Sequence, residues 1–162
     1  MSESKCEVPL QQLLNKTCES ILKVVSDTIG PENPDITAVL YLKWGFDGSS
    51  GHSGYKQKFV DTDLTDTSVF ISSLVPLRLG DLKTGQVLWR NPKPSSIRFC
   101  RPIRIQWLQE TTEVTKAEEI YITEQINALA PLTTFDVVGS VEYSLMLTMV
   151  DGKVCLCSLY SL

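Results

Sequence analysis

The chain has 162 residues, which is enough for one domain or a part of a larger one. Apolar residues make up 43% and charged residues 21%, the proportions of an ordinary globular protein. No run of about 18 apolar residues occurs, so we expect no membrane span. The five cysteines have no repeated spacing, which argues against a disulfide framework and favours a reducing compartment, the cytosol or nucleus.

The net charge of −4 conceals an uneven distribution of charge along the chain. Residues 83–104 carry basic side chains and no acidic one, with Trp89 and Phe99 between them. Cations for phosphates and rings for stacking are typical of a nucleic-acid surface. A basic edge that keeps a sheet from pairing with other chains is the alternative. The predicted DNA-binding residues are Lys83, Arg90, Lys93, Arg98, Arg101 and Arg104.

The first half of the chain predicts a helix followed by strands. Apolar residues recur at steps of three and four over residues 9–29, which predicts an amphipathic helix. β-Branched and aromatic residues alternate over 36–47, which predicts a strand. Residues 55–60 predict a second strand joined to the first as a hairpin. Residues 68–79 predict a third, in which Pro76 favours an edge or a bulge.

The second half predicts a loop, a strand, a helix and a last strand. Asn and Pro residues over 91–96 indicate a loop, and 102–108 returns to strand character. Thr115 and Glu118 have the spacing of a capping box, so we expect a helix to begin there and to end before Pro131. Residues 143–150 predict the final strand.

The segment WGFDGSSGHSGYKQ (44–57) admits several interpretations. A phosphate-binding P-loop needs Lys after its last glycine and then a helix, whereas Tyr55 and a strand pattern follow here. A carboxylate at a strand end beside glycines, such as Asp47, is a potential Mg²⁺ ligand for phosphodiester chemistry. The simpler alternative is an Asp-Gly turn. His52, the one histidine of the chain, is interpreted as a solvated loop residue.

Further candidate metal ligands follow the predicted strand 102–108. Glu110 and Glu113 are candidates, although acids before a helix commonly serve to stabilise its N-terminus. Cys155 and Cys157 form a C-x-C pair, which departs from the usual zinc-knuckle spacing and is more typical of buried thiols at a strand end.

Four stretches resemble a known family. KWGFDGSSGHSGYKQKF (43–59), WRNPKPSSIRFCRPIRIQW (89–107), TKAEEIYITEQINAL (115–129) and LMLTMVDGKVC (145–155) resemble Transib-type DNA transposases. More distantly, they resemble the core of the vertebrate V(D)J recombination-activating recombinase. The resemblance covers roughly residues 36–155.

The resemblance implies part of a ribonuclease H-like fold, an α+β or α/β arrangement of a mixed sheet with flanking helices. It implies that Asp47 matches the first acid of a DDE triad that binds Mg²⁺ or Mn²⁺. It also implies DNA as the partner, a nuclear location, and pairing as a homodimer or with a full-length transposase. We therefore divide the chain into a helix and linker (1–35), a partial transposase core (36–155) and a divergent tail (156–162).

Two functions follow from this reading. The first is a truncated fragment of a transposase core whose parent activity is metal-dependent DNA cleavage and strand transfer. In the family the other two acids of the triad lie further along than this sequence reaches, so we expect the chain alone to be inactive. The second is a non-enzymatic DNA-binding or protein-interaction module derived from a transposon. In the second reading the amphipathic helix 9–29 docks on a partner.

Overall fold

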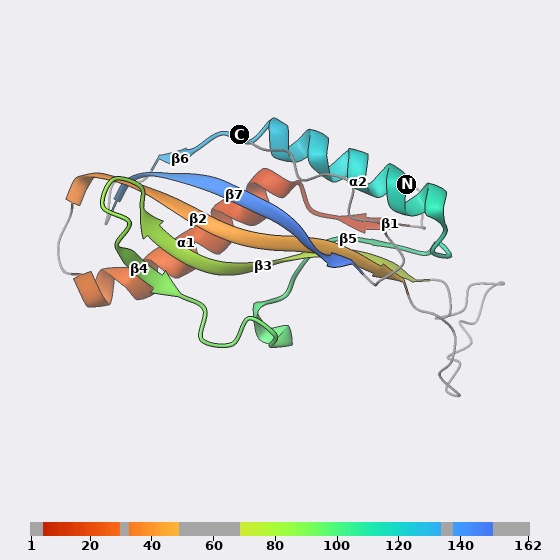
Figure 1. The fold of residues 1–162 in the computed structure, drawn as a ribbon, viewed down its shortest axis with the longest axis horizontal. Helices are drawn as coiled ribbons and strands as arrows, with labels where there is room; N and C mark the ends of the chain where they lie inside the picture. The colour runs from red at the N-terminus through yellow and green to blue at the C-terminus, as the bar shows by residue number, and fades with distance from the viewer. Residues whose placement is uncertain (1–4, 30–32, 49–68, 134–137, 151–162) are drawn as a thin grey trace.

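The described residues form a curled, mixed β-sheet flanked by two α-helices, an α+β architecture (Figure 1). The computed structural model describes residues 5–29, 33–48, 69–133 and 138–150. The helices are α1 (Leu10–Ile29) and α2 (Thr112–Asn127). The strands are β1 (Lys5–Glu7), β2 (Asn33–Gly48), β3 (Phe70–Asp81), β4 (Val87–Arg90), β5 (Arg101–Gln106), β6 (Leu132–Thr133) and β7 (Val138–Val150).

Strand β2 lies inside the sheet, in the order β1-β5-β3-β2-β7-β6, with β4 pairing β3 beside β5. It pairs antiparallel with β3 and parallel with β7. Strands β2, β3 and β5 form an antiparallel run, and the chain then passes through α2 before it enters β7. A parallel pair needs such a crossover because the chain must return to the end of the sheet at which it began.

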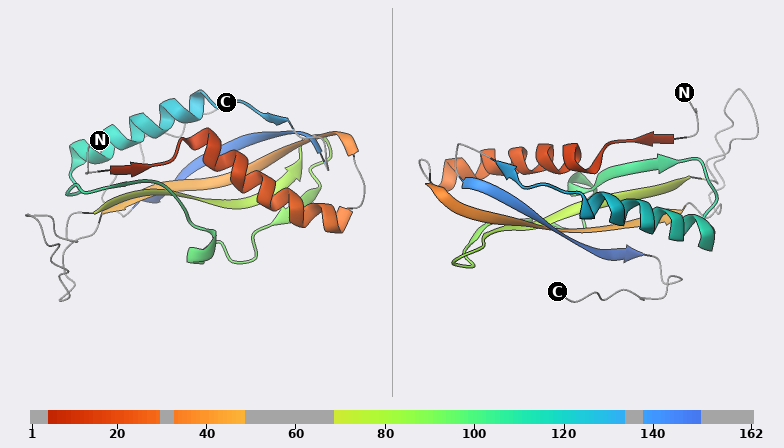
Figure 2. Two further views of the ribbon diagram at one scale, coloured as in Figure 1. Left: turned by 180° about the vertical axis from the view of Figure 1, so that it is seen from behind. Right: turned by 90° about the horizontal axis from the view of Figure 1, so that it is seen from above.

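One face of the sheet holds the hydrophobic core. Alternate residues of β2, namely Leu40, Leu42, Trp44 and Phe46, are buried there, because side chains of a strand alternate between its two faces. Helix α1 lies across this face (Figure 2, left), and its apolar stripe joins the same cluster. Helix α2 adds Ile122 to the cluster, so both helices cover the same face.

The opposite face of the sheet, which we call the open face, carries the other set of alternating residues. On β2 these are Val39, Tyr41, Lys43 and Asp47. Val39 is buried but is not part of the cluster under the helices, as the alternation requires. In the part of the chain that the structure describes, both helices lie on the other side.

Most of the predicted elements are confirmed with small shifts at their ends. Helix 9–29 is α1, and strands 36–47, 68–79, 102–108 and 143–150 are β2, β3, β5 and β7. Pro76 lies at a bulge, since Leu42 pairs with Pro76 while Tyr41 pairs with Arg78. The hairpin strand predicted at residues 55–60 lies outside the described residues. The short strands β1, β4 and β6 escaped prediction because two to four residues carry no clear periodicity.

The predicted capping box at the start of α2 is wrong. The helix begins one turn earlier, at Thr112, and Thr111 is the N-cap residue. The Thr111 side chain accepts a hydrogen bond from the Val114 amide at 3.3 Å. Thr115 and Glu118 lie within the helix and are buried against the sheet, so the spacing that suggested a cap reflects one buried face. Among the described residues, neither helix has the length and hydropathy to cross a membrane.

Helix α1 is tied to the rest of the fold by polar as well as apolar contacts. The Leu10 amide donates to Gln125 Oε1 of α2 at 3.0 Å, and the Tyr143 hydroxyl of β7 donates to Asn15 Oδ1 at 2.8 Å. Burial raises the pKa of Tyr143, and the neighbouring Cys18 and Glu19 add to the effect. The helix is therefore part of the core of the sheet.

A pair of substitutions on α1 tests this packing. Leu14 is fully buried, whereas Val24 on the same helix is 56% exposed. We expect Leu14→Ala to lower the free energy of unfolding by about 2–5 kcal/mol and Val24→Ala by less than about 1 kcal/mol. Urea denaturation followed by circular dichroism measures both. Equal, small effects would show that α1 does not share the core.

Two cysteines on either side of α1's N-terminus offer a second test. Burial raises the pKa of the Cys18 thiol from 9.0 to about 12, with the charge of Glu19 adding to the effect. Cys6 is exposed. Because the thiolate is the nucleophile, native Cys18 should be far less reactive at pH 8 than an exposed thiol. We expect iodoacetamide to alkylate Cys6 rapidly and Cys18 only after unfolding, as read by peptide mass spectrometry. Rapid alkylation of native Cys18 would contradict the packing of α1.

Candidate nucleic-acid and metal site

Asp47 lies at the carboxyl end of β2, as the alternating pattern of residues 36–47 predicted. The neighbouring Phe46 pairs with Val150 of parallel β7, and Asp47 pairs with Ile71 of antiparallel β3. Phe46 is buried under the helices, and the centre of its ring lies 5.6 Å from the centre of the Phe70 ring. Because side chains alternate along a strand, the side chain of Asp47 points to the open face. Asp47 is exposed there, which leaves its carboxylate accessible to a cation.

Glu110 lies at the same end of the sheet but on the helix side. A Cβ atom at Gly48 would come within 2.6 Å of Glu110 Cβ and 2.7 Å of its Oε2. Gly48 pairs with Phe70, which is buried under the helices, so Glu110 approaches β2 from that side. The glycine after Asp47 is thus required to admit the Glu110 side chain. The structure does not bring the Asp47 and Glu110 carboxylates to one face.

Glu113 lies in the first turn of α2 and is fully exposed. Its pKa is lowered, first by a hydrogen bond from its own backbone amide and then by the Thr111 side chain. A carboxylate in this position stabilises the positive end of a helix dipole. This placement fits the helix-terminus alternative better than a ligand shared with Asp47.

Within the described ranges, no three His, Cys, Asp or Glu residues come together as a metal-binding group. Asp47 is therefore one potential ligand and does not make a complete site. His52, Cys155 and Cys157, which were weighed from the sequence, lie outside the described residues, and so does Asp151.

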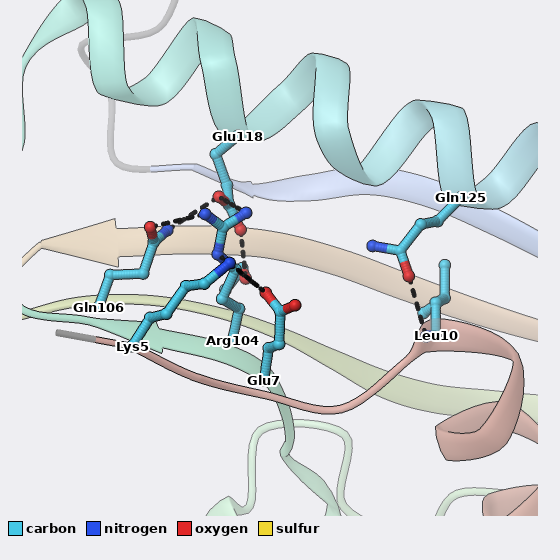
Figure 3. Close-up of polar contacts among 8 residues, drawn as sticks. Lys5, Glu7, Leu10, Arg104, Gln106, Glu118 and Gln125 are labelled. Atoms are coloured by element: carbon cyan, nitrogen blue, oxygen red, sulfur yellow. Dashed lines mark hydrogen bonds and ion pairs between the residues drawn. The ribbon is translucent and has the colours of Figure 1, made fainter. Parts of the chain in front are cut away.

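Arg104, predicted to bind DNA, is instead held in a cluster on the helix side (Figure 3). Its side chain is 15% exposed, and Nη1 lies 3.2 Å from Glu118 Oε2. Nη2 donates to Gln106 Oε1 at 2.8 Å, and Nε lies 3.5 Å from Glu7 Oε2. The guanidinium also lies 4.4 Å from the centre of the Tyr121 ring. These partners occupy the cation, so we leave Arg104 out of the DNA surface.

Glu118 is the centre of this cluster and is 3% exposed. Its two carboxylate oxygens accept hydrogen bonds from Ser72 Oγ at 2.7 Å and Gln106 Nε2 at 2.9 Å. Together with Arg104 and Glu7, it connects α2 to β3, β5 and β1. Burial raises the pKa of Tyr121, which lies beside this cluster, and the charge of Glu7 adds to the effect.

The other predicted DNA-binding residues lie on the β3–β4 turn, on β4, on the loop after it and at the start of β5. Lys83 lies in the β3–β4 turn, at the far end of β3 from Asp47, and its amide donates to Asp81 Oδ1 at 2.9 Å. The hydrogen bond from the Thr84 side chain, and then that from the Lys83 amide, lower the pKa of Asp81. Arg90 ends β4 and is exposed. Arg101 Nη1 donates to the Arg98 carbonyl at 2.8 Å.

The loop that carries Lys93 and Arg98 is held by the buried Asn91. Asn91 Nδ2 donates to the Pro76 carbonyl at 2.7 Å, and its Oδ1 accepts from the Lys93 amide at 2.9 Å. The 3-10 helix η2 (Ile97–Phe99) follows, and Phe99 contacts the Trp89 ring at 6.5 Å. Trp89 and Phe99, which were predicted to stack on bases, therefore contact each other. The hydrogen bonds of Asn91 hold the backbone that carries the exposed Lys93 and Arg98.

Two basic residues on the open face were missed by the sequence interpretation, namely Lys43 and Arg78. Both lie within strands, whereas the prediction followed a run of basic residues along the chain. The guanidinium of Arg78 lies 4.3 Å from the centre of the Tyr41 ring. The alternation of side chains along β2, combined with its register with β3, could have revealed that Arg78 lies beside Tyr41.

No model of a known protein family matches the chain, and no curated protein sequence is significantly similar to it.

A substitution of Glu118 tests the buried cluster. Glu118→Ala leaves Arg104 buried without its closest carboxylate, and we expect it to lower the free energy of unfolding by about 3–5 kcal/mol. Glu124→Ala, at an exposed position of the same helix, should change it by less than about 0.5 kcal/mol. Chemical denaturation of both variants gives the comparison. A Glu118→Ala protein as stable as the parent would contradict the central position of this carboxylate.

Proposed function

We propose that the chain is part of the catalytic core of a DNA-cleaving and strand-transferring enzyme of the DDE type. Asp47 would be one ligand of its Mg²⁺ or Mn²⁺ ions. The observation that carries this proposal is the position of Asp47. Its carboxylate is exposed at the end of an interior strand that has an antiparallel neighbour on one side and a parallel neighbour on the other.

The topology supports this proposal. Three antiparallel strands (β2, β3 and β5), then a helix, then a strand parallel to the first are the elements expected for the opening half of a ribonuclease H-like sheet. The resemblance to Transib-type transposases leads to the same expectation from motifs. Together they support the proposal that Asp47 is the first acid of the triad.

A second ligand is proposed from the sequence. Asp151 directly follows Val150, the last residue of β7. Asp151 lies outside the described residues, so it enters the proposal through the sequence alone. Oxygen ligands of this kind suit Mg²⁺. A bound metal ion would activate the attacking water or 3′-hydroxyl and stabilise the leaving oxygen.

The remaining roles belong to residues that hold DNA. Exposed cations on β4 and the following loop would meet backbone phosphates, and these are Arg90, Lys93 and Arg98. Such contacts position the substrate and carry no sequence information by themselves. In this account the chain orients a phosphodiester while Asp47 supplies negative charge for the metal.

The alternative function is a DNA-binding module without catalysis. It is favoured by the lack, among the described residues, of a group of three potential metal ligands. The separation of Asp47 and Glu110 onto opposite faces points the same way. In this alternative, DNA binding persists and Asp47 has no special part in it.

A nicking assay tests catalysis. We expect any nicking of a supercoiled plasmid by the chain in Mn²⁺ to depend on Asp47, so that Asp47→Asn reduces its rate by at least about 100-fold because a metal ligand is lost. Asp81→Asn, at the other end of the neighbouring strand β3, is the control and should nick like the parent.

The outcomes separate the two functions. Nicking that is equal in Asp47→Asn and the parent would contradict the role of Asp47. Binding of DNA by the parent without any nicking would favour the non-catalytic module.

A further inference from the structure

We propose that a strand of DNA lies along β2 on the open face of the sheet. Its phosphates would contact Arg78, Arg90 and Lys43, and it would continue toward Asp47. This inference rests on the proposed function in taking DNA as the partner. It adds Lys43 and Arg78 to Arg90, which the basic run of the sequence had already indicated.

The pairing of β2, β3 and β4 brings Lys43, Arg78 and Arg90 to the same face of the sheet. Tyr41 of β2 pairs with Arg78 of β3, and Arg78 pairs with Arg90 of β4. Residues directly opposite one another in a sheet point to the same face, so these side chains form one row across three strands. Lys43 lies two residues further along β2 and points to the same face.

The row is electrostatically unfavourable without an anion. Arg78 and Arg90 are both exposed and face each other as a like-charge pair, which destabilises a sheet. The ion pairs of the described residues involve Lys5, Lys16 and Arg104, and none of them involves the three cations of the row. Arg78 is instead oriented by the Tyr41 ring of β2, on the side of β3 opposite Arg90. A phosphate would relieve the repulsion and accept two parallel hydrogen bonds from each guanidinium.

The row and Asp47 share one face and one strand. Asp47 lies six positions after Tyr41, which is about 20 Å along a strand. At a stacked rise of about 3.4 Å per nucleotide this distance accommodates about six nucleotides. Lys43 continues the positive charge of the row along β2 toward Asp47. A polyanion whose phosphates repeat along its length fits this arrangement of Lys43, Arg78 and Arg90.

A charge-matched pair of variants tests the track. The first combines Lys43→Gln, Arg78→Gln and Arg90→Gln. The control combines Lys16→Gln, Lys23→Gln and Lys116→Gln, three exposed lysines on the helix layer. Fluorescence anisotropy with a labelled single-stranded oligonucleotide is measured at several salt concentrations, and thermal melts confirm that both variants are folded.

We expect the open-face variant to bind roughly tenfold more weakly or worse at moderate salt. Its slope of log K against log salt should be smaller by about 2, since each lost phosphate contact on a single strand removes about 0.7. The control variant should bind like the parent, and the melting temperature of the open-face variant should not fall by more than a few degrees, because a like-charge pair is removed.

Four results would overturn the track. The open-face variant binds like the parent, both variants weaken equally, the parent does not bind DNA, or the parent is a dimer that the open-face substitutions separate without changing DNA affinity. The last result would assign the face to a second copy of the chain. The nicking assay is read independently. Asp47-dependent nicking with an unaffected open-face variant would leave the proposed function standing and remove the track alone.

Discussion

The parallel pairing of β2 with β7 is the constraint on which the arrangement depends. Parallel neighbours cannot be joined by a tight turn, so the chain must cross one face of the sheet, and α2 provides this crossing. Helix α1 covers the same face, and the apolar residues of β2 therefore point to that side. Asp47 and Lys43, which alternate with them, point to the other. The separation of a buried face from a charged face follows from this pairing and from the two-residue period of a strand.

The buried carboxylate of Glu118 fixes α2 over the antiparallel strands. It accepts hydrogen bonds from β3 and β5, and Arg104 links it to Glu7 of β1. Buried charges are costly unless every partner is in place, so this cluster favours one position of the helix over others. That position brings Glu110, which precedes the helix, against Gly48. The position of α2 therefore determines how closely Glu110 approaches Gly48, the residue after Asp47.

Much of the fold could be predicted from periodicity. Long elements such as α1 and β2 have strong repeats of three to four or of two, and their boundaries agree within a few residues. The start of α2 could not be predicted, because a threonine and a glutamate three residues apart serve equally as a cap or as a buried face. The candidate site was predicted in part. Asp47 follows from its strand, but the fate of Arg104 depends on a helix residue 14 positions later. Lys43, Arg78 and Arg90 meet only through register.

The proposed DNA-binding surface is the open face of the sheet and not the helix layer. Nuclear magnetic resonance of the ¹⁵N-labelled protein, titrated with a single strand of about a dozen nucleotides, tests this residue by residue. The largest amide shifts should fall on Tyr41, Lys43, Asp47, Arg78 and Arg90, while the outer faces of α1 and α2 remain unchanged. Shifts concentrated on the two helices, with β2 and β3 unaffected, would contradict the account.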